Sequence, residues 1–375
     1  MDTGGSRGSN NNVEGKLLEA GCGHHHNHHH HHHHHHLPQF PKVALLFTMV
    51  SVSCLILYSS SDPFQFLPIS IQKPLFLKSV PLEEVLQNAA MPNRTVILTT
   101  LNEAWAAPNS TFDLFLESFR IGNQTRWLLN HLVVVALDQQ AYSRCLALHP
   151  HCYALTTKNV DFSAGEAFFM SPDYLKMMWR RIKFLHSVLQ MGYDFVFTDA
   201  DIMWFRNPFP RFYPDGDFQI ACDQFRGNSF DLNNNPNGGF NYVKSNNRTI
   251  RFYKFWYESK WNYPGMHDQD VLNRIKFHPF FQRIGIQIRF LNTAQFSGFC
   301  EPSKDFNVVC TMHANCCFGL ESKLHDLALA LEDWKKYMSL STNKNASQPM
   351  SWRVPQNCSV AWPPKQIKKT APKGS

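Results

Sequence analysis

The stretch that decides the fold reads Gly192-Tyr-Asp-Phe-Val-Phe-Thr-Asp-Ala-Asp-Ile-Met-Trp-Phe-Arg-Asn-Pro-Phe209. Residues 193–198 form a short, mainly apolar run, typical of a buried strand, and Asp199 and Asp201 follow at its end. In extended backbone, residues two apart point to the same side, so we expect both carboxylates to converge on one point. Two neighbouring carboxylates repel each other unless a cation lies between them, and a hard divalent ion with oxygen ligands fits. The stretch therefore predicts a metal site just past a buried strand.

The segment before this strand has the pattern of an amphipathic helix. Ser171 and Pro172 are an N-cap followed by a proline in the first turn, and Gly192 ends the pattern. Apolar residues recur at helical spacing at Tyr174, Met178, Ile182, Leu185 and Leu189. The opposite face carries Lys176, Arg180 and Lys183. Lys183 is a candidate for contact with a phosphate, and a solvated helix face is the alternative.

Two further apolar runs precede this helix. Residues 96–100 and 132–137 have the pattern of buried strands, and residues 111–119 between them have that of a helix. Apolar strands that alternate with helices predict an α/β domain with a mainly parallel sheet covered on both faces. Ligands of such sheets bind at the carboxyl ends of the strands. This topology places four polar residues at the ligand-binding edge: Thr99, Thr100, Asn102 and Asp138. For Asp138, a helix N-cap is an equal alternative.

Composition narrows the class of protein. The chain has 375 residues, 43% of them hydrophobic and 17% charged, which allows one large or two small domains and excludes a collagen, a coiled coil or a disulfide knot. The formal net charge is +7, but no Lys/Arg block marks a nucleic-acid patch, so we expect no nucleic-acid partner. Twelve of the 20 histidines lie between His24 and His36. This tract is a disordered tail, a transition-metal tract or an expression tag.

An uncharged apolar run of sixteen residues, 43–58, divides the chain. A membrane span needs at least about 17 residues, so a signal-peptide core is the alternative. The 42 residues before the run favour an uncleaved anchor with a cytosolic N-terminus. We expect five parts: a His-rich cytosolic tail 1–42, a transmembrane signal-anchor 43–58, a stem 59–93, an α/β domain 94–340 and a C-terminal tail 341–375.

Two features agree with a lumenal position for the residues after this run. All six N-glycosylation sequons follow it, at Asn93, Asn109, Asn123, Asn247, Asn345 and Asn357. Eight of the ten cysteines also follow it, which permits up to four disulfides in an oxidising compartment. Cys145 and Cys152 are close enough to pair locally. Pairing is open for Cys300, Cys310, Cys316, Cys317 and Cys358. Adjacent Cys316 and Cys317 lack the spacing of zinc ligands.

The Asp-x-Asp pattern alone is a weak signal, because it occurs three times in this chain. The pattern that begins at Asp215 follows Pro214 and predicts a turn. The one that begins at Asp268 precedes the helix-like residues 271–275, where helix capping is the alternative. Only the pattern that begins at Asp199 follows a buried strand.

The run from Gly192 to Phe209 resembles the signature of the plant nucleotide-diphospho-sugar transferases of glycosyltransferase family 77. The resemblance covers about residues 94–340 and includes three more motifs: Asn237-Gly-Gly-Phe-Asn-Tyr242, His267-Asp-Gln-Asp270 and His313-Ala-Asn-Cys-Cys-Phe-Gly-Leu-Glu-Ser-Lys323. It implies a GT-A fold in a single-pass type II Golgi membrane protein with a lumenal catalytic domain. It also implies manganese or magnesium, a UDP-sugar donor, and retaining transfer of a pentose such as xylose or arabinose to a cell-wall glycan or glycoprotein.

The resemblance also assigns roles to single residues. Asp201 is implied to hold the metal directly, and Asp199 to reach the metal or the ribose of the donor. His313 is the candidate for a third metal ligand, with an ordinary core histidine as the alternative. Lys323 is implied to contact the diphosphate.

Two further motifs belong to the implied site. Gly238 and Gly239 let the backbone pass close to a ligand, and the resemblance places their loop beside the donor sugar; a plain turn is the alternative. Asp268, Gln269 and Asp270 resemble the acceptor-side catalytic group, with Asp268 as the nearest carboxylate. Retention by a covalent carboxylate intermediate or by front-face attack stays open. Rival functions are a non-catalytic Golgi scaffold or lectin-like protein, and a metal-dependent phosphohydrolase.

Overall fold

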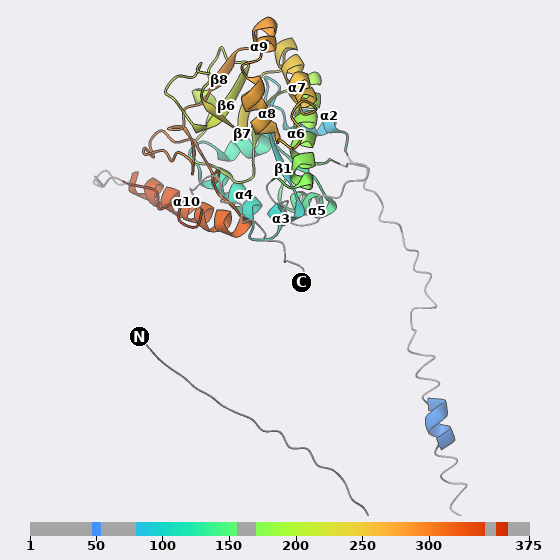
Figure 1. The fold of residues 1–375 in the computed structure, drawn as a ribbon. Coiled ribbons are helices and arrows are strands. Elements are labelled where there is room, and N and C mark those ends of the chain that lie inside the picture. The colour runs from blue at the N-terminus through green and yellow to red at the C-terminus, as the bar shows by residue number, and fades with distance from the viewer. Residues whose placement is uncertain (1–46, 54–79, 156–169, 342–349, 359–375) are drawn as a thin grey trace, which may run out of the picture. The chain divides into compact units, whose positions relative to one another are not determined.

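The computed structural model describes residues 47–53, 80–155, 170–341 and 350–358 (Figure 1). Most of the run 43–58, the whole His-rich tail and most of the stem lie outside these ranges. Residues 47–53 are helical. Among the described residues, no helix combines the length and apolar character needed to cross a membrane.

The folded domain is built around a seven-stranded, mainly parallel sheet with the order β3-β2-β1-β4-β7-β6-β8. The strands are β1 (Thr95–Leu101), β2 (Leu132–Ala136), β3 (Cys152–Ala154), β4 (Asp194–Thr198), β6 (Phe218–Gln224), β7 (Asn235–Val243) and β8 (Ile288–Phe290). β7 runs antiparallel to both of its neighbours, β4 and β6. The predicted α/β class is thus confirmed, and β1, β2 and β4 lie where the apolar runs placed them.

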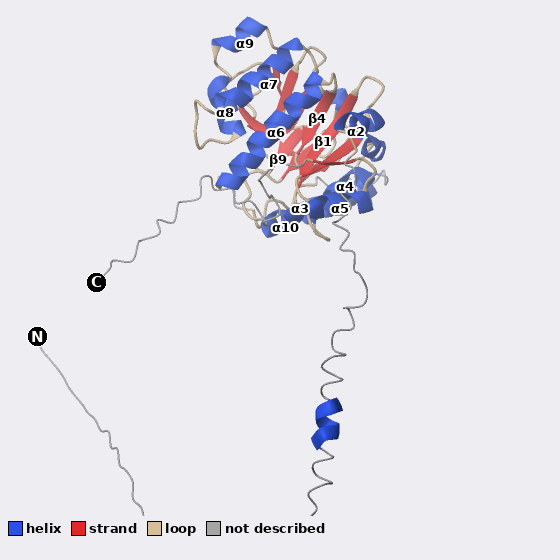
Figure 2. Cartoon of the chain, turned by 90° about the vertical axis from the view of Figure 1, so that its right-hand side faces the viewer, coloured by secondary structure: helices blue, strands red, loops and turns tan. Residues whose placement is uncertain are grey.

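Helices pack on both faces of this sheet (Figure 2). They are α2 (Leu82–Ala89), α3 (Glu103–Ala106), α4 (Thr111–Ile121), α5 (Gln139–Leu148), α6 (Pro172–Gln190), α7 (Asn247–Ser259), α8 (Asp268–Ile275), α9 (Pro279–Ile284) and α10 (Leu320–Ser341). One core contains residues of α2, α6, α7 and α8, and the other contains residues of α4, α5 and α10. Neighbouring strand residues such as Val96 and Ile97 enter opposite cores. This burial on both sides explains why the strands are continuously apolar.

α6 begins and ends as its sequence predicts. The Ser171 hydroxyl accepts a hydrogen bond from the Tyr174 N–H at 3.2 Å, and Pro172 is the first helical residue. After the helix, Gly192 adopts a φ of 78°, a left-handed conformation that glycine tolerates best. These two signals fix where the chain leaves α6 and enters β4.

A small second sheet lies beyond the end of β4. It consists of β5 (Ile202–Trp204), β10 (Thr311–His313) and β9 (Phe296–Gly298), with β10 in the middle. β5 and β10 are antiparallel, and His313 lies opposite Ile202, the residue that follows Asp201. This pairing brings the end of β10 beside the Asp199-Ala-Asp201 segment.

The domain includes segments that we expected outside it. α2 lies within the predicted stem, residues 59–93, and its Leu86 is fully buried against the sheet. Residues 350–358 lie within the predicted C-terminal tail, yet the Trp352 ring stacks on Phe306 with 3.8 Å between the ring centroids. The packed domain therefore extends on both sides of residues 94–340.

Three disulfides cross-link the described residues of this domain. They join Cys145 to Cys152, Cys300 to Cys316, and Cys317 to Cys358. The predicted local pair is confirmed, and the neighbouring Cys316 and Cys317 bind different partners. Cys222 and Cys310 are free and buried.

Candidate active site

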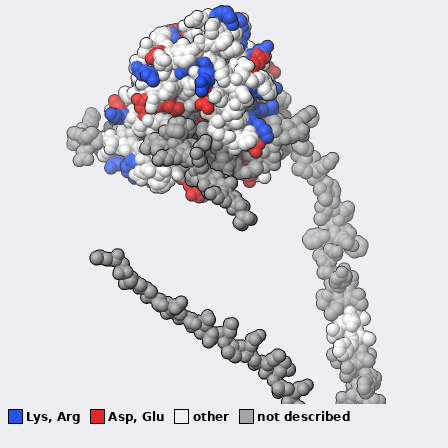
Figure 3. Space-filling model, viewed as in Figure 1, with Lys and Arg blue, Asp and Glu red and all other residues white. Residues whose placement is uncertain are grey.

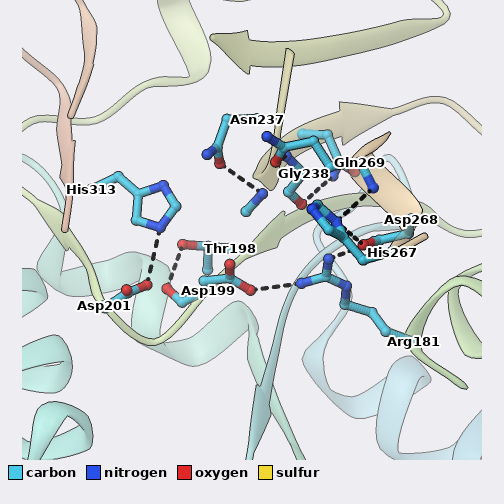
Figure 4. Close-up of polar contacts among 12 residues, drawn as sticks. Arg181, Thr198, Asp199, Asp201, Asn237, Gly238, His267, Asp268, Gln269 and His313 are labelled. Carbon is cyan, nitrogen blue, oxygen red and sulfur yellow. Dashed lines mark hydrogen bonds and ion pairs between the residues drawn. The ribbon is translucent and has the colours of Figure 1, made fainter. Parts of the chain in front are cut away.

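The turn after β4 carries the two carboxylates of the predicted metal site. The segment from Asp199 to Asp201 does not continue as extended backbone, because the Ile202 N–H donates to the Asp199 carbonyl at 3.2 Å and closes a turn. The turn still brings the carboxylates together: one ligand atom each of Asp199, Asp201 and His313 lie within 4.8 Å of one another (Figure 4). The predicted convergence is confirmed, but a turn produces it.

His313 reaches this point through the small sheet. Beyond the β5–β10 pairing, the Ala314 N–H donates to the Asp201 carbonyl at 3.1 Å. The Nε2 atom of His313 then lies 3.2 Å from Oδ1 of Asp201. His313 is therefore part of the site, as the resemblance implied.

The donor atoms of this cluster fit a divalent cation. The Asp201 side chain is 2% exposed, and its Oδ1 accepts no hydrogen bond from the residues that the structure describes. A buried carboxylate oxygen without a hydrogen bond is costly unless another partner, such as an ion, approaches it. Two carboxylates suit magnesium or manganese, and an imidazole is compatible with a transition ion.

Lys323 of α10 provides a fixed positive charge at the same cluster. Its Nζ lies 2.6 Å from Oδ2 of Asp201 and 5.4 Å from the ring centroid of Trp105 in α3. Burial alone would raise the pKa of Asp201, but Lys323 and His313 outweigh it and hold that pKa well below its usual range. Asp201 is thus ionised in the folded protein.

Arg181 is a site residue that the sequence analysis did not identify. It lies on the buried face of α6 and is 5% exposed. Its Nη1 is 2.9 Å from Oδ1 of Asp199, and its Nη2 is 2.6 Å from Oδ2 of Asp268 (Figure 4). Burial and the neighbouring Asp201 raise the pKa of Asp199, and Arg181 opposes that rise. One feature of the sequence could have identified Arg181 as a site residue: it lies next to Ile182, on the apolar face of the predicted helix.

The start of α8 forms the other side of the site. His267 caps this helix by accepting the Gln269 N–H on Nδ1 at 3.2 Å. Asp268 is 1% exposed, and burial alone would raise its pKa, but Arg181 and His267 lower it to about 2. Asp270 does not join the buried cluster: its side chain is 48% exposed and lies 3.4 Å from Nε2 of His267. The motif therefore lies at the start of a helix, as the capping alternative predicts: His267 is the N-cap, and Asp268 and Asp270 lie in the first turn of α8.

The Asn237-Gly-Gly-Phe240 segment is a strand, and our expectation of a loop or turn was wrong. It belongs to β7, which hydrogen-bonds with β4 and β6 and is covered on both sides. The Asp199 N–H donates to the Gly239 carbonyl at 2.7 Å. A Cβ atom at Gly239 would lie 2.6 Å from Oδ2 of Asp199 and 2.6 Å from Cε1 of His313. Gly239 therefore allows the backbone of β7 to pass close to Asp199 and His313. A Cβ at Gly238 would meet nothing nearer than 3.5 Å.

Asp223 is a second residue that the sequence analysis missed. Its carboxylate accepts hydrogen bonds from the side-chain amides of Asn237 at 2.8 Å, Asn315 at 2.9 Å and Gln269 at 3.0 Å. The other end of the Gln269 amide accepts the Gly238 N–H at 2.8 Å. Asp223 thus orients groups from β7, α8 and the segment after β10, and no local sequence pattern marks it.

The structure does not bring Lys183 to the site. Lys183 is exposed, and its Nζ lies 5.9 Å from the Tyr257 ring. Residues two positions apart in the sequence are about 200° apart around a helix. Lys183 therefore points away from the site when Arg181 points toward it. The solvated helix face, our alternative, describes Lys183 correctly.

The polar residues in the last part of β1 and just after β1 and β2 lie at the predicted edge of the sheet. Asn102 and Asp138 are N-caps of α3 and α5, and Asp138 also accepts the Glu103 N–H at 2.7 Å. Capping, our alternative for Asp138, is therefore what the structure contains. Thr99 is buried and Thr100 is partly buried.

Comparison with known proteins identifies the family of this chain. The family model of the nucleotide-diphospho-sugar transferases matches residues 127–327, and the chain belongs to this family, as the resemblance indicated. An uncharacterized protein of Arabidopsis thaliana is 53% identical over 282 residues, which are 75% of this chain and 74% of that protein.

More distant relatives have named activities. The beta-arabinofuranosyltransferase RAY1 of Arabidopsis thaliana is 25% identical over 174 residues, 45% of this chain and 30% of RAY1. Among solved structures, mouse xyloside xylosyltransferase 1 is similar with a TM-score of 0.37 and 16% identity, over 59% of this chain and 98% of that one.

Proposed function

We propose that the chain is a metal-dependent retaining glycosyltransferase that moves a sugar from a UDP-sugar to a hydroxyl of a cell-wall glycan or glycoprotein. The observation that carries the proposal is the convergence of Asp199, Asp201 and His313 within 4.8 Å in a member of the nucleotide-diphospho-sugar transferase family. The name of RAY1 supports arabinose as the transferred pentose, and xylose is the second candidate.

Asp199, Asp201 and His313 would hold manganese or magnesium, with Oδ1 of Asp201 as one ligand atom. A bound divalent ion supplies positive charge that neutralises a leaving diphosphate. Lys323 adds a fixed positive charge beside Asp201, so it can bind and orient the same diphosphate. Gly239 leaves open the space between Asp199 and His313 that a side chain would fill.

On the acceptor side of the site, Arg181 pairs with Asp268 and keeps it ionised. Asp268 is buried and ionised, because Arg181 and His267 lower its pKa to about 2. An ionised carboxylate is the state needed to attack the anomeric carbon or to stabilise positive charge there. In front-face attack, the leaving diphosphate takes the proton of the acceptor hydroxyl, and Asp268 only positions neighbouring groups.

We also propose that the protein is a single-pass type II protein of the Golgi membrane with a lumenal domain. The apolar run 43–58, followed by all six sequons, supports this orientation. The three disulfides among the described residues support an oxidising compartment.

The test uses the purified full-length protein, a panel of sugar nucleotides and manganese, with nucleotide release as the readout. Asp201→Asn is expected to abolish metal-dependent release. Asp215→Asn is the matched control, because Asp215 belongs to another Asp-x-Asp pattern and pairs with Arg289. Full release by Asp201→Asn would overturn the proposal. Binding of a sugar nucleotide without release would favour the scaffold or lectin-like alternative, and free phosphate without sugar transfer would indicate a hydrolase.

A further inference from the structure

A concave surface lies on the outer side of α6, and we call it the basic groove. It is lined by one face of α6, by Tyr257 near the end of α7 and by the segment 260–266, and its volume is about 510 Å³. Small-molecule sites have volumes of roughly 300–1,000 Å³. Its lining contains no Asp or Glu but four basic residues: Lys176, Arg180, Lys183 and Lys260. The groove is therefore electrostatically suited to an anionic ligand.

The charge of this lining differs from that of the surface drawn in Figure 3. On the face of the domain drawn in Figure 3, Lys and Arg side chains are interspersed with Asp and Glu. A general positive surface would bind anions anywhere, whereas the basic groove concentrates positive charge along one wall. Lys176 does have an acidic partner just outside the groove, since its Nζ lies 3.0 Å from Oδ1 of Asp173.

Aromatic rings line the same groove. Trp261 is 76% exposed, and Nζ of Lys260 lies 3.7 Å from the ring centroid of Tyr257 and 4.6 Å from that of Trp261. Lys183 lies above the same Tyr257 ring. Exposed aromatic faces pack against the C–H faces of sugar rings, and ammonium groups pair with carboxylates. Rings and ammonium groups at one place therefore match a sugar that carries a carboxylate.

The wall that carries Trp261 is held in place. The Tyr263 N–H donates to the Lys260 carbonyl at 3.3 Å, and the Met266 N–H donates to the Tyr263 carbonyl at 3.3 Å. The indole N–H of Trp179 donates to the Met266 carbonyl at 3.1 Å and fastens this wall to α6. A preformed wall lowers the ordering cost of binding a ligand.

The basic groove adjoins the start of α8, which forms the acceptor side of the proposed active site. Its wall ends at Met266, and the next residues are His267, which caps α8, and Asp268, which binds Arg181. On α6, Tyr174 lies between groove residues in the sequence, and its ring makes an edge contact with His267 at 6.2 Å. The groove and Asp268 are thus linked by the segment 266–268 and by the contact of Tyr174 with His267.

We propose that the basic groove binds an acidic oligosaccharide, a glycan bearing uronate carboxylates, as the acceptor of the transferase. This inference rests on the proposed function. The carboxylates pair with Lys183 and Lys260, and one sugar ring packs on Trp261. The concave shape and the neighbouring start of α8 favour a glycan over a membrane surface.

The test is equilibrium binding of hexagalacturonate and of an uncharged galactan hexasaccharide to the full-length protein. We expect tighter binding of the acidic oligosaccharide, with an affinity that falls as salt rises. Trp261→Ala should weaken that binding about tenfold, and Lys183→Ala about threefold. Matched controls are Trp127→Ala, at a tryptophan that is 47% exposed elsewhere, and Lys336→Ala, at an exposed lysine of α10; both should bind normally.

Equal affinity for the two oligosaccharides, or unchanged affinity in both groove variants, would overturn the proposal. The proposal would also be overturned if these variants lost binding to phosphatidylserine vesicles but kept oligosaccharide binding, because the groove would then be a membrane contact. UDP binding with manganese is measured on the unaltered protein in parallel. If the protein bound the oligosaccharide but not UDP, only the proposed function would be contradicted. If it bound UDP but not the oligosaccharide, only the proposed role of the groove would be contradicted.

Discussion

The Nζ atom of Lys323 lies 2.6 Å from Oδ2 of Asp201, although 122 residues separate them in the sequence. The two oxygens of Asp201 therefore have different surroundings. Oδ2 is paired with Lys323, while Oδ1 faces His313 at 3.2 Å and accepts no hydrogen bond from the described residues. Lys323 thus keeps Asp201 ionised and leaves one of its oxygens for a metal ion.

Lys323→Met is expected to lower the free energy of unfolding by about 3 kcal/mol in metal-free buffer, because Asp201 would keep a buried charge without its main partner. Manganese should raise the Tm of this variant more than that of the unaltered protein, since the ion would replace the missing charge. Thermal unfolding with and without manganese measures both effects. Lys335→Met is the control, because its ion pair with Glu117 is exposed and worth about 0.5 kcal/mol. An identical response to manganese in Lys323→Met and the unaltered protein would refute this role.

Arg181→Met is expected to destabilise the protein by about 3–5 kcal/mol, because Asp199 and Asp268 would both lose a buried partner. Arg181→Lys should recover only part of this loss, since one ammonium group cannot reproduce the two contacts of a guanidinium. Chemical denaturation measures these differences. Adding Asp268→Asn to Arg181→Met should restore stability by removing the unpaired charge. No restoration in the double variant would argue against the ion pair.

Gly239→Ala is expected to reduce metal-dependent turnover by roughly 10²-fold, because the new Cβ would displace Asp199 or His313 from the metal site. Gly238→Ala is the matched control one residue away, where a Cβ makes only ordinary contacts, and it should lose much less. Manganese affinity, measured by calorimetry for both variants, separates the effect on the site from global unfolding. Equal losses at the two glycines would contradict the close approach at Gly239.

The stability of the domain is expected to depend on pH through His149. Burial lowers the pKa of His149 to about 4, and its Nε2 lies 2.6 Å from the Leu132 carbonyl. As pH falls from 6.5 toward 4, His149 binds a proton in the unfolded chain but stays neutral in the folded chain. The free energy of unfolding therefore falls, by about 3 kcal/mol in total. Above pH 6.5 this contribution to stability is fully present. His149→Gln retains a donor for Leu132 without titrating, so its urea-unfolding profile should flatten over this range. Parallel profiles for the two proteins would refute this assignment.

The elements around the site were predictable where their signals are local. β1, β2 and β4 are buried on both faces, so their apolar runs are unbroken, and α6 has its N-cap at Ser171 and its stop at Gly192. β7 was not predictable, because the Gly238-Gly239 pair disfavours a strand. Pairing with β4 and β6, which are distant in sequence, overrides that local preference.

The sequence by itself determined the α/β class, the two carboxylates after β4 and the family. Only the tertiary structure decided which charges meet at the site. Arg181, and not the predicted Lys183, is the α6 cation that reaches the site, because α6 turns one face to the sheet and the other to solvent. Lys323 and His313 reach Asp201 because β10 pairs with β5 and α10 follows it. Contacts of this kind depend on strand register and helix packing across the whole domain, and no local spacing in the sequence encodes them.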